Sequence, residues 1–234
     1  MLVQKFLIGH IPAILCGAES DKVFLFIHGK DGCKEEAAAF ADSASRSGWQ
    51  VLGIDLPEHG ERKNGGVQML PWNAVPELQT LMVYAKQHWK NIAVRANSIG
   101  AWFSMLSFAG EPIHKCLFVS PILDMEKLIK NMMRWAQVTE ERLQKEGQIQ
   151  TSFGETLSWE YLSYVRSHPI SSWNAPTSIL YAGQDNLTDR ATVEDFAKRH
   201  HANLTVMENG EHWFHTPEQL AFLKQWTETE LNLL

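Results

Sequence analysis

The strongest constraint on the fold is a repeated alternation of short apolar runs with longer segments of helical periodicity. The apolar runs lack the polar alternation of a half-exposed strand, which is typical of strands buried on both faces of a sheet. They occupy residues 23–27, 51–55, 92–94, 115–119, 177–181 and 204–207. Strands that are separated by helices predict an α/β fold, with a mostly parallel twisted sheet and helices on both faces.

Helical periodicity marks the segments between these runs. We expect helices at about 34–47, 75–88, 99–109, 190–200 and 217–231. Two further apolar runs open the chain, at residues 2–8 and 11–16, and Gly9 and His10 separate them. This arrangement predicts an antiparallel hairpin at the start of the sheet.

The stretch 122–173 interrupts the alternation. It carries a helical pattern, then polar residues, then aromatic residues, and no strand is evident. We therefore expect a small helical insertion here, and a core formed by residues 1–121 and 174–234. A length of 234 residues fits one large α/β domain with such an insertion.

The charge balance and cysteine count narrow the possible partners. A net charge of −6 argues against binding to nucleic acid or to an anionic membrane surface. No apolar run approaches the roughly 18 residues of a membrane-spanning helix, and the N-terminus lacks a signal-peptide pattern, so no membrane insertion is expected. The odd number of widely spaced cysteines (Cys16, Cys33 and Cys116) predicts no disulfide framework and a reducing compartment, the cytoplasm.

One strand–helix junction stands out, at Ser98. It follows the apolar run 92–94 within the sequence A-N-S-I-G of residues 96–100. A strand that turns directly into a helix strains the backbone of the corner residue and exposes its side chain. Small residues such as Ala96 and Gly100 are needed because the strand and helix approach closely. The pattern indicates a nucleophilic serine, and the alternative is a serine that caps the helix.

Other chemically active residues follow the remaining strands. In an open parallel sheet, the residues after the strands meet at one edge. A serine hydroxyl becomes nucleophilic when a neighbouring base accepts its proton, and that base needs a carboxylate to orient it. Ser98, Asp185 and His212 supply these three roles in chain order. The residues found after the strands are His28, Asp55, Ser98, Asp124, Asp185 and His212.

The chain resembles the α/β-hydrolases. The turns that carry the resemblance are His28-Gly29, Asp55-x-Pro57-x-His59-Gly60, Ala96-x-Ser98-x-Gly100, Tyr181-Ala-Gly-Gln-Asp185 and Gly210-Glu-His212. They come in the family's order and span nearly the whole chain. The resemblance implies that Ser98 is the nucleophile, Asp185 the acid and His212 the base.

The resemblance also implies how the rest of the site is built. The backbone N–H groups of Ile99 and Lys30 would form the oxyanion hole, and the insertion at 122–173 would form a lid over the pocket. The first position of the serine motif is Ala96 where the family has glycine. The loop after His28 reads Gly-Lys-Asp-Gly rather than a glycine run, so Asp31 is an alternative to Lys30 as the second donor.

Alternatives exist for the base and the acid. His215 competes with His212 as the base. Asp124 and Asp189 compete with Asp185 as the acid, although Asp189 is placed to cap the helix that follows it. The two histidines at 212 and 215 lack a third ligand at a suitable spacing, so no metal site is expected.

The remaining polar and aromatic candidates have structural interpretations. His28 is expected to hydrogen-bond to loop backbone, and Asp55, His59 and Arg62 are expected to stabilise their own loop. Four of the nine tryptophans are candidates for the substrate pocket, with a place in the core or the lid as the alternative. These are Trp102, Trp135, Trp159 and Trp213.

The sequence therefore predicts a lidded serine hydrolase that cleaves a carboxylic ester or related acyl bond through an acyl-enzyme. It requires no cofactor and no metal. Thioesterase, amidase, peptidase or acyltransferase activity would use the same residues, and a non-catalytic ligand-binding protein is the rival of another class. The expected partner is a small-molecule acyl substrate. The oligomeric state is left open, with a homodimer as one option.

Overall fold

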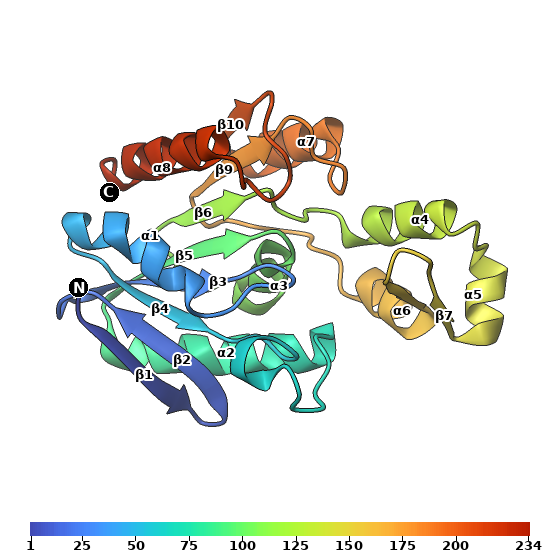
Figure 1. Cartoon of the computed structure of the whole chain (residues 1–234), viewed down its shortest axis with the longest axis horizontal. Helices are drawn as coiled ribbons and strands as arrows, with labels where there is room; N and C mark the ends of the chain where they lie inside the picture. Colours follow the sequence, from blue (N-terminus) through green and yellow to red (C-terminus); the bar gives the residue numbers. More distant parts are fainter. The chain divides into compact units, whose positions relative to one another are not determined.

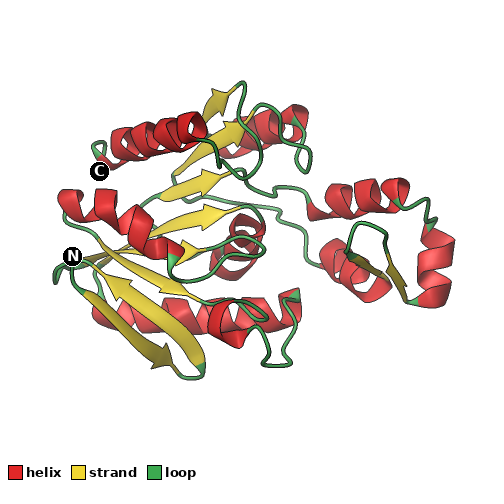
Figure 2. Ribbon diagram, viewed as in Figure 1, coloured by secondary structure: helices red, strands yellow, loops and turns green.

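A computed structural model describes all residues from 1 to 234, and the chain falls into two compact units. The larger unit consists of Met1–Leu123 and Ser172–Leu234. The smaller unit, Asp124–Ser171, is inserted between these two segments of the larger one. Each unit has its own helices and strands (Figure 2).

The larger unit is built on an eight-stranded sheet (Figure 1). Its strands are β1 Val3–Ile8, β2 Ile11–Cys16, β3 Lys22–Ile27, β4 Gln50–Ile54, β5 Asn91–Asn97, β6 Cys116–Val119, β9 Thr177–Ala182 and β10 Asn203–Met207. They lie in the order β1-β2-β4-β3-β5-β6-β9-β10. Strand β2 runs antiparallel to both of its neighbours, and all other pairs are parallel. The predicted opening hairpin and mostly parallel sheet are confirmed.

Helices cover both faces of this sheet. They are α1 Glu36–Ala44, α2 Pro71–His88, α3 Ile99–Phe108, α7 Arg190–His200 and α8 Pro217–Leu231, with 3-10 turns η1 Ser45–Ser47 and η2 Gly60–Arg62. Helices α1 and α8 pack together on one face, and α2 and α3 pack together on the other (Figure 1). Helix α2 begins at Pro71 rather than near residue 75, because proline is well suited to the first helical position. No helix has the length and apolarity to cross a membrane.

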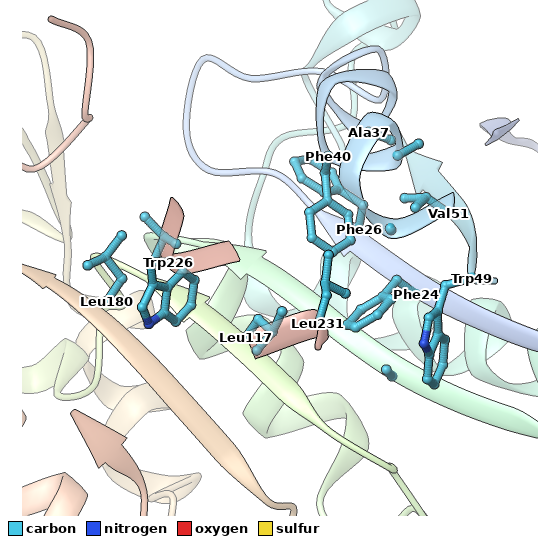
Figure 3. Close-up of a cluster of buried hydrophobic side chains, with 14 of the residues drawn as sticks. Phe24, Phe26, Ala37, Phe40, Trp49, Val51, Leu117, Leu180, Trp226 and Leu231 are labelled. Atoms are coloured by element: carbon cyan, nitrogen blue, oxygen red, sulfur yellow. The ribbon is translucent and has the colours of Figure 1, made fainter. Parts of the chain in front are cut away.

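Aromatic and aliphatic side chains fill the core between the sheet and the helices α1 and α8 (Figure 3). The ring of Phe24 lies 5.0 Å from that of Phe40 and 4.8 Å from that of Trp49, measured between centroids. Leu117 and Trp226 extend the cluster toward β6 and α8. Burial of each such side chain contributes about 1.5–3 kcal/mol. This packing anchors β3 and β5 to the helices on one face of the sheet, and the ends of these two strands carry the candidate site.

The smaller unit contains α4 Met125–Trp135, α5 Glu140–Glu146, α6 Trp159–Ser167 and the strands β7 Gln148–Gln150 and β8 Thr156–Ser158. The expectation of a helical insertion without strands was wrong, since β7 and β8 pair as an antiparallel ribbon. Each of these strands has three residues, and one of the three is buried, Ile149 or Leu157. Such short strands are below the length at which alternation is visible in a sequence.

Candidate active site

Ser98 occupies a sharp corner between β5 and α3. Its backbone has φ 51° and ψ −122°, a conformation that costs a non-glycine residue roughly 1–3 kcal/mol. Its side chain makes no capping hydrogen bond to α3, which contradicts the interpretation as a capping serine. The Ser98 N–H donates to Val119 O at 3.0 Å, and the Ser98 carbonyl accepts from the Ile122 N–H at 3.1 Å. Both backbone contacts hold the corner in its strained form.

Two glycines allow this corner to contact the turn that follows β3. A Cβ atom on Gly100 would lie 2.5 Å from His28 O and 2.6 Å from Ile27 O, which is too close for any side chain. A Cβ atom on Gly29 would lie 3.2 Å from the Cβ of Ser98. The predicted need for a small residue at position 100 is therefore explained by direct backbone contact with the end of β3.

A continuous chain of hydrogen bonds joins Ser98 to His212 and Asp185. The Oγ of Ser98 lies 2.8 Å from Nε2 of His212, and Nδ1 of His212 lies 2.7 Å from Oδ2 of Asp185. The other Asp185 oxygen accepts the N–H groups of Leu187 and Thr188, which fix the carboxylate in place. A carboxylate only accepts, so Nδ1 carries the ring proton and Nε2 is left to accept from the serine hydroxyl. This is the geometry that an activated serine requires.

The competing residues make other contacts. Nδ1 of His215 faces Glu211 at 3.4 Å, and its side chain is half exposed. Asp189 and Asp124 each accept a backbone N–H as the N-cap of the helix that follows, α7 and α4 respectively. The structure thus brings together Ser98, His212 and Asp185 and gives each competitor a different partner. It contains no group of three or more His, Cys, Asp or Glu side chains arranged to hold a metal ion.

The candidate oxyanion donors lie on both sides of Ser98. Ile99 is the first residue of α3, so its N–H is among those that a helix leaves unsatisfied at its positive end. On the other side, the Asp31 N–H donates to Nε2 of His59 at 3.0 Å. That N–H therefore has a partner within the protein, and the choice of Lys30 as the second donor stays a prediction.

His28 lies fully buried directly before the turn that follows β3. Nδ1 donates to Gly29 O at 2.7 Å, and Nε2 accepts the Leu56 N–H at 3.0 Å, so the predicted bond to loop backbone is confirmed. Burial lowers the pKa of His28 to about 4, which keeps the ring neutral at neutral pH. His28 therefore joins the turn after β3 to the turn after β4.

The loop after β4 is held by its own charged residues, as the sequence predicts. Asp55 is fully buried and pairs with Lys34, and Arg62 donates to Asp55 O and pairs with Glu77. His59 donates through Nδ1 to Pro57 O. No sequence pattern indicates two of the contacts in this region. They are the buried pair of Asp55 with Lys34, and the bond between His59 and the Asp31 N–H in the turn after β3.

The four tryptophans proposed for a pocket have different environments. Trp102 on α3 is buried in the larger unit. Trp213 directly follows His212 and is 73% exposed. Trp135 and Trp159 lie in the smaller unit, and Trp135 is half exposed. Among these four residues, Trp213 combines an exposed ring with a position next to His212 in the chain. For all four, a role in a substrate pocket stays a prediction.

At the level of sequence, the chain is similar to a known protein over only part of its length. No family model matches the chain. The hydrolase PyiE of Pyricularia grisea is 30% identical over 120 residues, which cover 47% of this chain and 26% of that protein. The match therefore spans about a quarter of the length of this curated relative.

Comparison with solved structures is more extensive. Est1E from Butyrivibrio proteoclasticus, in a structure with ferulic acid bound, aligns with a TM-score of 0.74 at 17% identity over 97% of both chains. Mouse alpha/beta hydrolase domain-containing protein 10 aligns with a TM-score of 0.76 at 10% identity over 99% of both chains. The Pyrococcus furiosus esterase Pf2001 aligns with a TM-score of 0.68 at 18% identity, over 95% of this chain and 85% of that one. This chain therefore has the α/β-hydrolase fold, and the resemblance inferred from its turns is confirmed at the level of the fold.

Proposed function

We propose that this chain is a serine hydrolase that cleaves a carboxylic ester bond in a small acyl substrate. The observation that carries the proposal is the hydrogen-bonded chain from Ser98 through His212 to Asp185, with the serine on a strained strand–helix corner. A strained backbone is retained only where the surrounding structure imposes it, and such strain is concentrated at functional sites. A serine with a purely structural role needs neither the strain nor an oriented imidazole.

In the proposed reaction, Ser98 Oγ attacks the carbonyl carbon while Nε2 of His212 accepts the hydroxyl proton. Asp185 stabilises the imidazolium that forms. The N–H groups of Ile99 and Lys30 hold the oxyanion, and loss of one such donor typically costs roughly 10²–10³-fold in kcat. His212 then gives its proton to the leaving alcohol, and an acyl-enzyme remains. Water, deprotonated by His212, then attacks the acyl carbon. The bond to Ser98 Oγ breaks, His212 returns its proton to that oxygen, and the acid is released.

The choice of an ester is supported by relatives of the same fold. Two of the aligned structures are Est1E, with ferulic acid bound in one of its structures, and the esterase Pf2001. Thioesters, amides, peptides and transfer of the acyl group to an acceptor alcohol would use the same residues. A panel of p-nitrophenyl esters of rising acyl length, with matched acyl thioesters and anilides, separates these classes by kcat/KM.

We also propose that the smaller unit acts as a lid. Its support is its place in the chain, between β6 and β9, and its exposed aromatic side chains Trp135 and Phe153. Replacement of residues 124–171 by a short Gly/Ser linker should leave the hydrolysis of an acetyl ester intact and change the preference for acyl length. An unchanged preference across the ester panel would argue against a lid.

The location and the partner are proposals as well. All three cysteines are free thiols, and Cys16 and Cys116 are buried, which supports a reducing compartment such as the cytoplasm. The proposed partner is a small acyl substrate. The oligomeric state, for which a homodimer is one option, is measured directly by sedimentation.

The central proposal is tested by labelling with a fluorophosphonate probe. Wild-type protein should react, and Ser98→Ala should abolish both labelling and ester hydrolysis. His212→Ala should reduce labelling strongly, because the serine then lacks its base. Wild-type protein that is folded, as judged by circular dichroism, and that neither reacts with the probe nor hydrolyses any ester of the panel would sink the proposal and favour a ligand-binding role.

A further inference from the structure

We propose that His59 is a positioning residue for the oxyanion hole, because its ring fixes the peptide that follows Lys30. The inference rests on the proposed function and adds to it a residue outside the hydrogen-bonded chain of Ser98, His212 and Asp185. It follows from the way in which two consecutive peptide groups of the turn after β3 are held.

The first of these peptides joins Gly29 to Lys30. The Gly29 carbonyl accepts from Nδ1 of His28 at 2.7 Å and from the Gly32 N–H at 3.2 Å. In a trans peptide the C=O and N–H groups point in opposite directions, so the anchored carbonyl directs the Lys30 N–H away from His28. Gly29 itself lies against Ser98, which places this peptide beside the nucleophile.

The second peptide joins Lys30 to Asp31. Its N–H donates to Nε2 of His59 at 3.0 Å. Asp31 has φ 62°, a left-handed conformation that is uncommon for a residue other than glycine. With the peptides on both sides held, the two backbone dihedrals of Lys30 are fixed, and the direction of its N–H is fixed with them. The bond to His59 thus anchors the second peptide.

His59 is well suited to act as a fixed acceptor. Nδ1 donates to Pro57 O at 2.8 Å, which leaves Nε2 without a proton and able to accept. The side chain is buried, and its ring lies 5.2 Å from that of His28. The loop that carries His59 is tied down by the buried pair of Lys34 and Asp55. The acceptor is therefore held by a rigid support.

The alternative is that His59 only stabilises its own loop. Each ring nitrogen of His59 serves one of these roles. Nδ1 bonds to Pro57 in its own loop, and Nε2 bonds to Asp31 in the turn after β3. Two substitutions separate them in the same way. The amide of His59→Asn takes the place of Nδ1 and keeps a donor for Pro57 O, but it does not reach Asp31. The amide of His59→Gln takes the place of Nε2 and keeps an acceptor for the Asp31 N–H.

The experiment compares these two variants with wild type by steady-state hydrolysis of a p-nitrophenyl ester and by inhibition with a trifluoromethyl ketone, which forms a tetrahedral oxyanion adduct. We expect His59→Asn to lower kcat by roughly tenfold or more, within the 10²–10³-fold limit for one lost donor, with KM little changed. The inhibition constant of the ketone should rise in step. His59→Gln should retain most of kcat.

The opposite ranking overturns the proposal. If His59→Asn keeps wild-type kcat, or if both variants lose activity equally with a fall in unfolding midpoint, His59 serves only the loop. A wild-type protein that hydrolyses nothing and does not react with a fluorophosphonate overturns the proposed function instead. In that case amide hydrogen exchange at Asp31, measured by NMR, still tests the bond. If the Asp31 amide exchanges faster in His59→Asn but not in His59→Gln, the result supports the proposal that His59 fixes this peptide. Equal exchange rates in all three proteins overturn it.

Discussion

Nζ of Lys34 lies 2.7 Å from Oδ2 of Asp55, and the two side chains are 1% and 0% exposed. The Lys34 N–H donates to the other oxygen of Asp55 at 2.8 Å. Burial alone would lower the pKa of the Lys34 amine, but hydrogen bonds to Asp55 and Glu61 outweigh it and raise the pKa above its usual value. This pair joins the segment between β3 and α1 to the turn after β4.

Breaking this pair should destabilise the protein strongly. Lys34→Met leaves the Asp55 carboxylate buried without its cation, and we expect a loss of about 3–5 kcal/mol in the free energy of unfolding. The matched control is Lys5→Met, because Lys5 pairs with Glu35 in solvent at 57% and 43% exposure and should contribute far less to stability. Urea unfolding followed by circular dichroism measures both. Equal, small losses in the two variants would contradict the prediction.

Relief of the strain at Ser98 should stabilise the protein while it removes activity. Glycine adopts φ 51° freely, so Ser98→Gly recovers roughly 1–3 kcal/mol of strain. Part of the gain is lost to the greater chain entropy of glycine, about 0.5–1 kcal/mol. We expect Ser98→Gly to be about 1 kcal/mol more stable than Ser98→Ala in urea unfolding, and both to be inactive. A glycine variant no more stable than the alanine variant would show that the corner stores no strain.

Asp185 should be needed for activity far more than for stability. In Asp185→Asn the amide oxygen can still accept from Leu187 and Thr188, while its NH₂ group faces Nδ1 of His212. Nδ1 must then accept, which places the ring proton on Nε2 and leaves no acceptor for Ser98. We expect kcat to fall by about 10⁴-fold, by analogy with other serine triads.

The control for this prediction is Asp189→Asn. Asparagine caps a helix about as well as aspartate, so this variant should keep near wild-type kcat and stability. If Asp189→Asn lost activity and Asp185→Asn kept it, the acid would be Asp189 and the prediction would be wrong.

His28 should make the protein less stable in mild acid. Its pKa is about 4 in the folded protein and near its ordinary 6.5 in the unfolded chain, so between these values the unfolded chain binds a proton that the folded protein does not. The contribution of His28 to the free energy of unfolding is fully present above pH 6.5. It falls by up to about 1.4 kcal/mol per pH unit below that pH, and it is lost below about pH 4.

The measurement compares the pH dependence of unfolding free energy in wild type and His28→Asn. The asparagine amide keeps a donor near Gly29 O but does not titrate, so the variant should be less stable overall and have a shallower slope between pH 6.5 and 4. The slope difference is the informative quantity, because the other titrating groups are common to both proteins. Parallel slopes would show that His28 protonates in the folded state.

The regular part of the fold could be predicted from the chain because it depends on local pattern. A strand that is buried on both faces must be apolar throughout, as in residues 23–27, and this pattern survives in the sequence without any knowledge of its neighbours. The strands β7 and β8 left no such pattern, since Ile149 and Leu157 are single buried positions in three-residue strands. Their pairing depends on contacts within the smaller unit rather than on local preference.

The sequence by itself determined the class of fold and the three residues whose order and turn positions fit an activated serine. The tertiary structure decided which of the competing residues meet. His212 rather than His215 lies at Ser98, and Asp185 rather than Asp124 lies at His212. It also decided that His59 holds Asp31 across two separate turns. The physical reason is that hydrogen bonds act over about 3 Å, and residues far apart in the chain come within that range only when the sheet brings their turns to one edge.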